Sequence, residues 1–236
     1  MASTSERTFG SKLANAKAIG THLEGFTDYA ALTPEQSAPS LNTFIATIEA
    51  DNDQLAGNLT LYSGAVEIRQ QLYLKAPDSV IKLMSPIAKA ISSTYGKESK
   101  ELADVTRLTT KIRGDKPKKA SKAGSIPEED EVSQSAKSYG SVKQNFADLI
   151  AKLNKLDKYK PANKKITIAE LTAKLQLLDQ TNDNVTASYG TLKKDKDKRT
   201  ANYDALSSLV LRIKDAVSSQ YTNSSSEYKL IKGLSV

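Results

Sequence analysis

The stretch 41-LNTFIATIEADNDQLAGNLTLYSGAVEIRQQLY-73 decides the fold, because its apolar side chains recur alternately four and three residues apart. This spacing places them on one face of a helix, where they form a continuous seam. The same seam recurs 130 residues later in 171-LTAKLQLLDQTNDNVTASYGTLKKDKDKRTANY-203. Three other members coincide as well, namely Asn52 with Asn182, Arg69 with Arg199, and Tyr73 with Tyr203. The repeat predicts two related helical units.

A shorter helix is predicted before each long one, over residues 5–29 in the first copy and 139–159 in the second. The connections that follow contain Pro34 and Pro39 in the first copy and Pro161 in the second. Proline removes a backbone donor and disfavours helix in the residue before it. Because the connections are short, we expect each pair of helices to lie antiparallel as a hairpin.

The seam of the second copy continues to Tyr221, with no Gly or Pro between Thr191 and Tyr221. Two architectures follow: one helix of about 50 residues, or a bend near Gly190 or within 193–199 that folds the tail back as a third helix. We favour three helices per copy, because a first helix of about 21 residues covers less than half of such a partner.

The first copy interrupts itself at Ala76–Pro77 and again at Pro86, which predicts a break or kink at each. Both copies then close alike, but Tyr95 and Tyr221 are offset by 126. The first copy therefore holds four extra residues after Tyr73, about one helical turn, which a seam can absorb.

The sequence thus predicts an all-α protein of two tandem antiparallel helical bundles that arise from an internal duplication. The bundles have three helices each, or are hairpins with one very long helix. The first is expected over residues 1–114, a charged flexible linker over 115–136, and the second over 137–236. The linker has too little apolar surface to offset its ordering entropy. The first bundle is neutral, whereas the second carries 18 Lys and Arg against 10 Asp and Glu.

A resemblance supports this architecture. A short helix, the sequence Tyr-Lys-Pro-Ala-Asn from Tyr159, a long helix and the ending Tyr-x-x-x-Ser-x-Glu-Tyr-Lys-x-Ile-Lys-Gly over 221–233 follow one another. This order resembles an uncharacterised bacterial family of tandem helical proteins with no known activity. The resemblance covers both halves, is better in the second, and implies the fold alone.

The composition leaves few catalytic groups. With no Cys and a single His, His22, the chain lacks zinc motifs and a thiolate nucleophile, and a serine triad would depend on that one imidazole. No glycine-rich phosphate loop occurs. Four carboxylates could bind a hard cation but lack an EF-hand loop, and we interpret them as surface charges: Asp51, Asp53, Asp179 and Asp183. We expect no enzymatic activity and no catalytic residue, cofactor, metal or small-molecule substrate.

Asn52 and Asn182 lie inside the seams. An asparagine there can fix the register of helix packing, and a contact with a ligand is the alternative. The register interpretation is favoured, because an amide among aliphatic residues has a structural task available. For Arg69 and Arg199 we expect packed stems with guanidinium groups in water.

With a polar start and no apolar run of about 20 residues, we expect a cytoplasmic protein without a membrane partner. The duplication favours a non-enzymatic helical interaction or structural module that binds protein partners or copies of itself. The alternative is a nucleic-acid-binding protein that uses the basic second bundle. Its candidate residues are Lys152, Lys155, Lys158, Lys160, Lys164 and Lys165 and, in a run of alternating charge, Lys193, Lys194, Lys196, Lys198 and Arg199.

Overall fold

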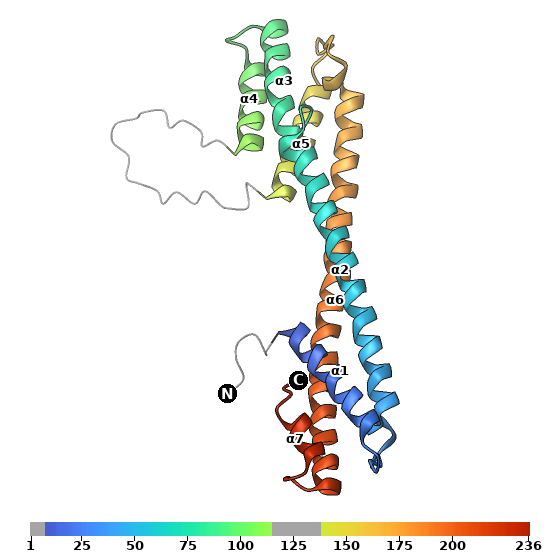
Figure 1. Ribbon diagram of the computed structural model, residues 1–236. Helices are drawn as coiled ribbons and strands as arrows, with labels where there is room; N and C mark the ends of the chain where they lie inside the picture. The colour runs from blue at the N-terminus through green and yellow to red at the C-terminus, as the bar shows by residue number, and fades with distance from the viewer. Residues whose placement is uncertain (1–7, 115–137) are drawn as a thin grey trace, which may run out of the picture. The chain divides into compact units, whose positions relative to one another are not determined.

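The computed structural model describes residues 8–114 and 138–236, and over those ranges it is all-α, which confirms the predicted class (Figure 1). The elements in chain order are α1 (Phe9–Gly25), the 3-10 turn η2 (Pro34–Gln36), α2 (Ala38–Gln70), the π-helical turn η3 (Gln71–Lys75), α3 (Val80–Tyr95), α4 (Lys100–Arg113), α5 (Tyr139–Asn154), the 3-10 turn η5 (Lys164–Ile166), α6 (Ile168–Tyr221) and α7 (Ser226–Lys232). The predicted linker 115–136 lies outside the described residues.

The second copy forms one very long helix, α6, which runs without a break for 54 residues. The separate third helix that we favoured there is therefore wrong, and the alternative of one very long helix is confirmed for this copy. Gly190 and the charged run 193–199 both lie inside α6. Continuity is affordable because a single Gly costs a helix only about 1 kcal/mol, and the seam keeps its spacing on both sides.

The first copy breaks where Pro77 predicts. α2 passes into η3, and the amide of Ala76 donates to the carbonyl of Gln71 at 3.0 Å. After a short turn α3 begins at Val80, and Pro86 lies inside it. The four extra residues of the first copy fall in this segment, where the wider π turn and the turn after it take up the surplus.

The described helices pack as two compact units, and neither unit matches a predicted bundle. Unit 1 combines residues 8–61 with Tyr189–Val236, and unit 2 comprises residues 62–114 and 138–188 of the described chain. Each unit joins the hairpin of one copy to the closing helices of the other. These units are cut differently from the predicted bundles 1–114 and 137–236, which stay a prediction of the sequence.

Helix length explains why the closing helices of each copy pack against the hairpin of the other copy. Asn182 and Tyr203 belong to one continuous helix and are 21 residues apart in the sequence. The two ends of one seam therefore cannot both pack against the same short hairpin. The closing helices of each copy cover the hairpin of the other copy instead.

Unit 2 contains α3, α4, α5 and the first part of α6. α4 packs against both α3 and α5, as Figure 1 shows in green and yellow. Its largest fully buried side chains include Tyr73, Met84, Ile87, Phe146 and Leu149. Each contributes roughly 1.5–3 kcal/mol, so this interleaved core holds the two copies together.

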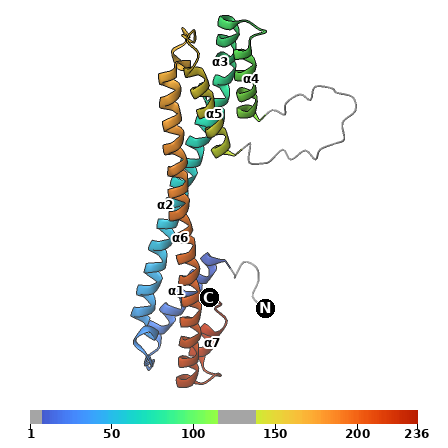
Figure 2. The ribbon, with the colours of Figure 1, turned by 180° about the vertical axis from the view of Figure 1, so that it is seen from behind.

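Unit 1 contains α1, the first part of α2, the last part of α6, and α7. α1 lies beside α2 in both views and contacts α7 (Figure 2). The core joins Ile19, Leu41 and Ile48 of the first copy to Leu206 and Ile213 of the second. Leu41 and its equivalent Leu171 are both fully buried, each in its own unit, as equivalent seam positions should be.

The hairpin turns are held by equivalent tyrosine bonds. The Tyr29 hydroxyl donates to the Gln36 carbonyl at 3.0 Å, and the Tyr159 hydroxyl donates to the Ile166 carbonyl at 2.7 Å. A tyrosine hydroxyl from the other copy then accepts a hydrogen bond from a backbone amide of each turn. These two bonds join Asp28 to the Tyr221 hydroxyl at 3.1 Å and Lys158 to the Tyr95 hydroxyl at 3.0 Å.

Candidate functional site

The seam asparagines bind tyrosines of the opposite copy. The Asn52 amide donates to the Tyr203 hydroxyl at 3.0 Å in unit 1, and the Asn182 amide donates to the Tyr73 hydroxyl at 2.8 Å in unit 2. Burial is the main cause that raises the pKa of Tyr73, so its hydroxyl stays neutral and needs a partner. Both amides therefore have the structural task that the register interpretation requires.

The seam arginines differ from expectation in one respect. Both residues are half-buried, and their guanidinium groups lie over aromatic rings, Arg69 at 4.1 Å from the centre of Tyr139 and Arg199 at 4.5 Å from that of Phe9. The Nε atom of each is buried without a hydrogen-bond partner among the described residues. A planar, weakly hydrated guanidinium stacks well on a ring, which explains the difference.

The lysines of the alternating run lie on α6 in unit 1. Lys198 pairs with Asp51 at 2.7 Å, and hydrogen bonding from that ammonium is the main cause that lowers the pKa of Asp51. Asp195, within the same run, accepts from Asn58 at 2.6 Å. Lys193, Lys194 and Lys196 are exposed. The helix thus brings the predicted lysines together, but carboxylates are interspersed among them.

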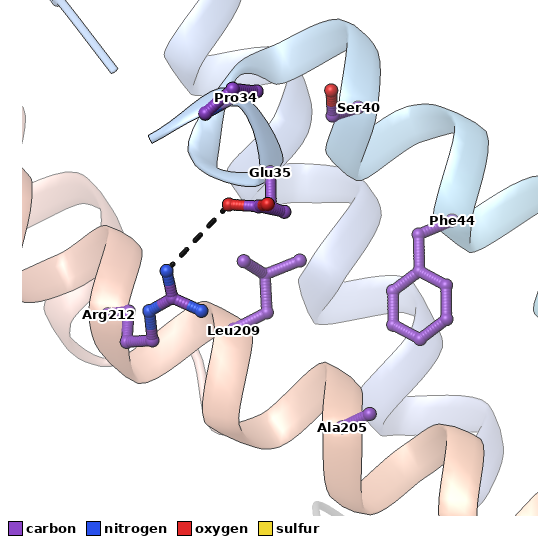
Figure 3. Close-up of a pocket in the computed structure, with 7 residues that line it drawn as sticks. All are labelled: Pro34, Glu35, Ser40, Phe44, Ala205, Leu209 and Arg212. Carbon is purple, nitrogen blue, oxygen red and sulfur yellow. Dashed lines mark ion pairs between the residues drawn. The ribbon is translucent and has the colours of Figure 1, made fainter. Parts of the chain in front are cut away.

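A groove on unit 1 is the cavity that the sequence did not predict (Figure 3). It measures about 350 Å³ and lies between the start of α2 and the last part of α6. Figure 3 shows side chains from both walls facing the space. The lining residues are Pro34, Glu35, Ser40, Phe44, Ala205, Leu209 and Arg212.

Local sequence builds the first wall. Pro34 begins the 3-10 turn η2. The Ser37 hydroxyl accepts a hydrogen bond from the Ser40 backbone amide at 3.3 Å and so caps α2. The same hydroxyl donates to the Ser40 hydroxyl at 3.0 Å. Phe44 follows one turn later and is half-buried. The serines of this wall are therefore already engaged in hydrogen bonds.

An ion pair closes one end of the groove. The Arg212 guanidinium lies 3.9 Å from the Glu35 carboxylate and donates to the Thr33 hydroxyl at 3.2 Å. Hydrogen bonding with the Thr33 side chain is the largest cause that lowers the pKa of Glu35, so the carboxylate stays ionised at neutral pH. Both charged groups are more than half exposed, and an outside group can compete for either of them.

The equivalent place in unit 2 has different chemistry. Lys174 replaces Phe44, and its ammonium lies 3.4 Å from Asp78, a residue of the four-residue surplus segment. The charge of Lys174 is the main cause that lowers the pKa of Asp78. The remaining equivalences are Pro34 with Lys164, Glu35 with Lys165, Ser40 with Glu170, Leu209 with Leu83, and Arg212 with Pro86. Comparing the two copies residue by residue is the signal that could have revealed the groove.

Other candidate sites hold no assembled chemistry in the described ranges. His22 is half-buried on α1 and does not line the groove. Across residues 8–114 and 138–236, no three His, Cys, Asp or Glu side chains are grouped so as to hold a metal ion. Among the helices described, none combines the length and apolar character needed to cross a membrane. No family model, curated protein or solved structure matches the chain.

Proposed function

We propose that this chain is a non-enzymatic helical interaction module whose groove on unit 1 receives an amphipathic helix of a protein partner. The observation that carries the proposal is the difference between equivalent positions. Unit 2 forms the same hairpin with Lys174 and Lys164 where unit 1 has Phe44 and Pro34. Apolar residues are therefore not needed there for folding, and a partner that covers them would recover their hydrophobic free energy.

Helix-in-groove recognition suits this site. Phe44 and Leu209 offer apolar contact on opposite walls, as an inserted Leu or Ile side chain requires. Glu35 and Arg212 at one end can exchange their weak mutual pair for charges on the partner and so set its direction. A second copy of this chain is the other occupant that the duplication favours. The cytoplasmic location stays a prediction of the sequence.

Site-specific photocrosslinking in the source cells tests the proposal. A photoreactive amino acid replaces Ser40 in the groove of the full-length chain, and the matched control carries it at the equivalent Glu170 in unit 2. We expect an adduct of one discrete mass from position 40 and none from position 170. An adduct of twice the chain's mass identifies a second copy as the partner.

A second variant ties the adduct to the groove. Phe44→Lys installs the residue found at the equivalent position of unit 2, so the adduct should disappear while circular dichroism shows the chain still helical. Absence of an adduct at position 40, or equal adducts at positions 40 and 170, would contradict the proposal.

A further inference from the structure

The basic surplus of the chain belongs to unit 2 and not to the second copy as a whole. Among described residues, unit 1 carries 11 Lys and Arg against 11 Asp and Glu, whereas unit 2 carries 17 against 10. The exchange of helices therefore concentrates a net charge of +7 in one unit and leaves the other neutral. The sequence pattern alone does not indicate this division, because it groups the helices of each copy into a bundle of their own.

Six exposed lysines of unit 2 gather around one contact and form what we call the lysine patch. The amide of Lys158 donates to the Tyr95 hydroxyl, which brings the turn after α5 against the end of α3, and η5 also packs against α3. The patch consists of Lys97, Lys155, Lys158, Lys160, Lys164 and Lys165. In the described ranges the ion pairs of unit 2 use other lysines, namely Lys75, Lys143, Lys152 and Lys174.

Unit 1 is an internal reference for the patch. Its equivalent turn makes the same two tyrosine bonds, so the backbone arrangement is shared. The six equivalent residues include no base: Asn223, Gly25, Asp28, Ala30, Pro34 and Glu35. The turn therefore folds without lysine, and six like charges held close together repel one another. A function outside the fold accounts for them.

We propose that the lysine patch binds the phosphate backbone of nucleic acid, independently of the partner proposed for the groove. Lysine ammonium groups on long stems act as mobile point charges that suit phosphates. The patch has no arginine, and its two tyrosine hydroxyls are already bonded. The lysines supply none of the bidentate or stacking groups that read bases, and Asn163 beside them already accepts a hydrogen bond from the Lys165 backbone amide, so binding should ignore sequence.

Other anionic partners fit the patch less well. Protein interfaces are depleted in lysine and depend on Trp, Tyr and Arg anchors. Binding at a membrane surface needs apolar side chains beside the bases. Among the described residues of unit 2, the exposed large apolar ones are Ile68, Leu74 and Leu177, and none belongs to the turn that carries the patch. Six lysines outnumber the exposed carboxylates beside them, Asp157 and Glu98, and a surface of this kind favours a polyphosphate.

Fluorescence anisotropy with a 20-base-pair DNA duplex tests the proposal on the full-length chain. We expect binding at 50 mM salt that weakens about 100-fold by 200 mM, as roughly four phosphate contacts require. The first variant changes Lys155, Lys158 and Lys160 to Gln. Its matched control changes Lys193, Lys194 and Lys196 to Gln, so the two variants have the same net charge.

The patch variant should lose at least tenfold in affinity at 50 mM salt and show a shallower salt dependence, while the control changes less than twofold. Circular dichroism should show both variants folded, since all six side chains are exposed. Equal losses in both variants, or no binding by the unaltered chain, would overturn the proposal. Tighter binding to phosphatidylserine vesicles or to polyglutamate than to DNA would overturn it as well, in favour of a membrane or an acidic protein.

Discussion

Units 1 and 2 use the same internal contacts beneath different surfaces. In both, a seam asparagine binds a tyrosine of the other copy, and a second tyrosine fixes the hairpin turn. Around that turn, unit 1 is uncharged or acidic where unit 2 has lysine, as the equivalence of Pro34 and Lys164 illustrates. Contacts that two copies share report on folding, and positions where they differ are free to serve separate partners.

The largest effect should come from burying a charge in one unit. Leu171→Asp places a carboxylate at a fully buried position of unit 2, at a cost of about 4 kcal/mol or more, which is enough to unfold that unit. Hydrogen exchange read by mass spectrometry should become fast in α3 and α4, while α7 stays protected. The matched Leu41→Asp should give the reverse pattern. If residues 203–232 exchanged fast in Leu171→Asp while residues 80–113 stayed protected, the simple division into two tandem bundles would be restored.

The hairpin tyrosines should distinguish the units by pH. Burial raises the pKa of Tyr159 from its ordinary value of 10.0 to about 12. The unfolded tyrosine ionises near pH 10 while the folded one stays neutral, so its stabilisation is complete below pH 10 and lost between pH 10 and 12. The loss is about 2 kcal/mol.

Thermal melts from pH 8 to 11.5 measure this loss. Tyr159→Phe should decline less with pH than the unaltered chain. Tyr29→Phe should alter the slope less, because Tyr29 is only half-buried, although burial and the neighbouring Tyr221 raise its pKa as well. Identical pH slopes in all three proteins would show that the Tyr159 hydroxyl titrates normally.

A double-mutant cycle should reveal the exchange directly. Asn182→Ala and Tyr73→Phe, measured by urea unfolding, should each cost about 1–2 kcal/mol and couple by about 1 kcal/mol, because their side chains share a hydrogen bond. The control pairs Asn182→Ala with Tyr203→Phe, two residues of one copy that belong to different units. Their effects should add within about 0.5 kcal/mol. Coupling in the control pair alone would show that Asn182 bonds Tyr203 of its own copy and not Tyr73.

The smallest effect concerns the turn before each closing helix. Gly96 and its equivalent Thr222 both have positive φ, at 93° and 73°. A β-branched residue is strained there, so Thr222→Gly should stabilise unit 1 by about 1 kcal/mol despite the added freedom of the unfolded chain. Gly96→Thr should destabilise unit 2 by at least as much. Differential scanning calorimetry would show a rise for the first variant and a fall for the second, and the opposite order would contradict the equivalence.

Much of the architecture follows from the sequence. The spacing around Leu41 and Leu171 correctly predicts helices and the burial of these two residues, although the equivalent seam positions Leu59 and Tyr189 are exposed. Pro77 correctly predicts the break after the first long helix. The pairing of the copies was missed because the two hairpins present equivalent faces, and pattern alone does not say which closing helix covers which. The separation of Asn182 and Tyr203 along one helix was the available signal, since no short hairpin spans it.

The site was less predictable. The alternating lysines were found by their local density. Carboxylates offset part of their charge, since Asp51 of the first copy pairs with Lys198, and Asp195 within the run is bonded by Asn58 of the first copy. The groove needs Phe44 of the first copy and Leu209 of the second, 165 residues apart, to face each other. No local motif encodes such a meeting, whereas substitution of Lys174 for Phe44 marks the position once the copies are aligned.

The order of helices also sets a timetable on the ribosome. Unit 2 lies within one continuous span of the chain, whereas the hairpin of unit 1 is made first and its cover, ending with Ile231, is made last. At about 5–20 residues per second, the newborn hairpin waits roughly 10 to 35 s with Ile19 and Leu41 uncovered. Protection by a chaperone during translation therefore matters more for this hairpin than for unit 2.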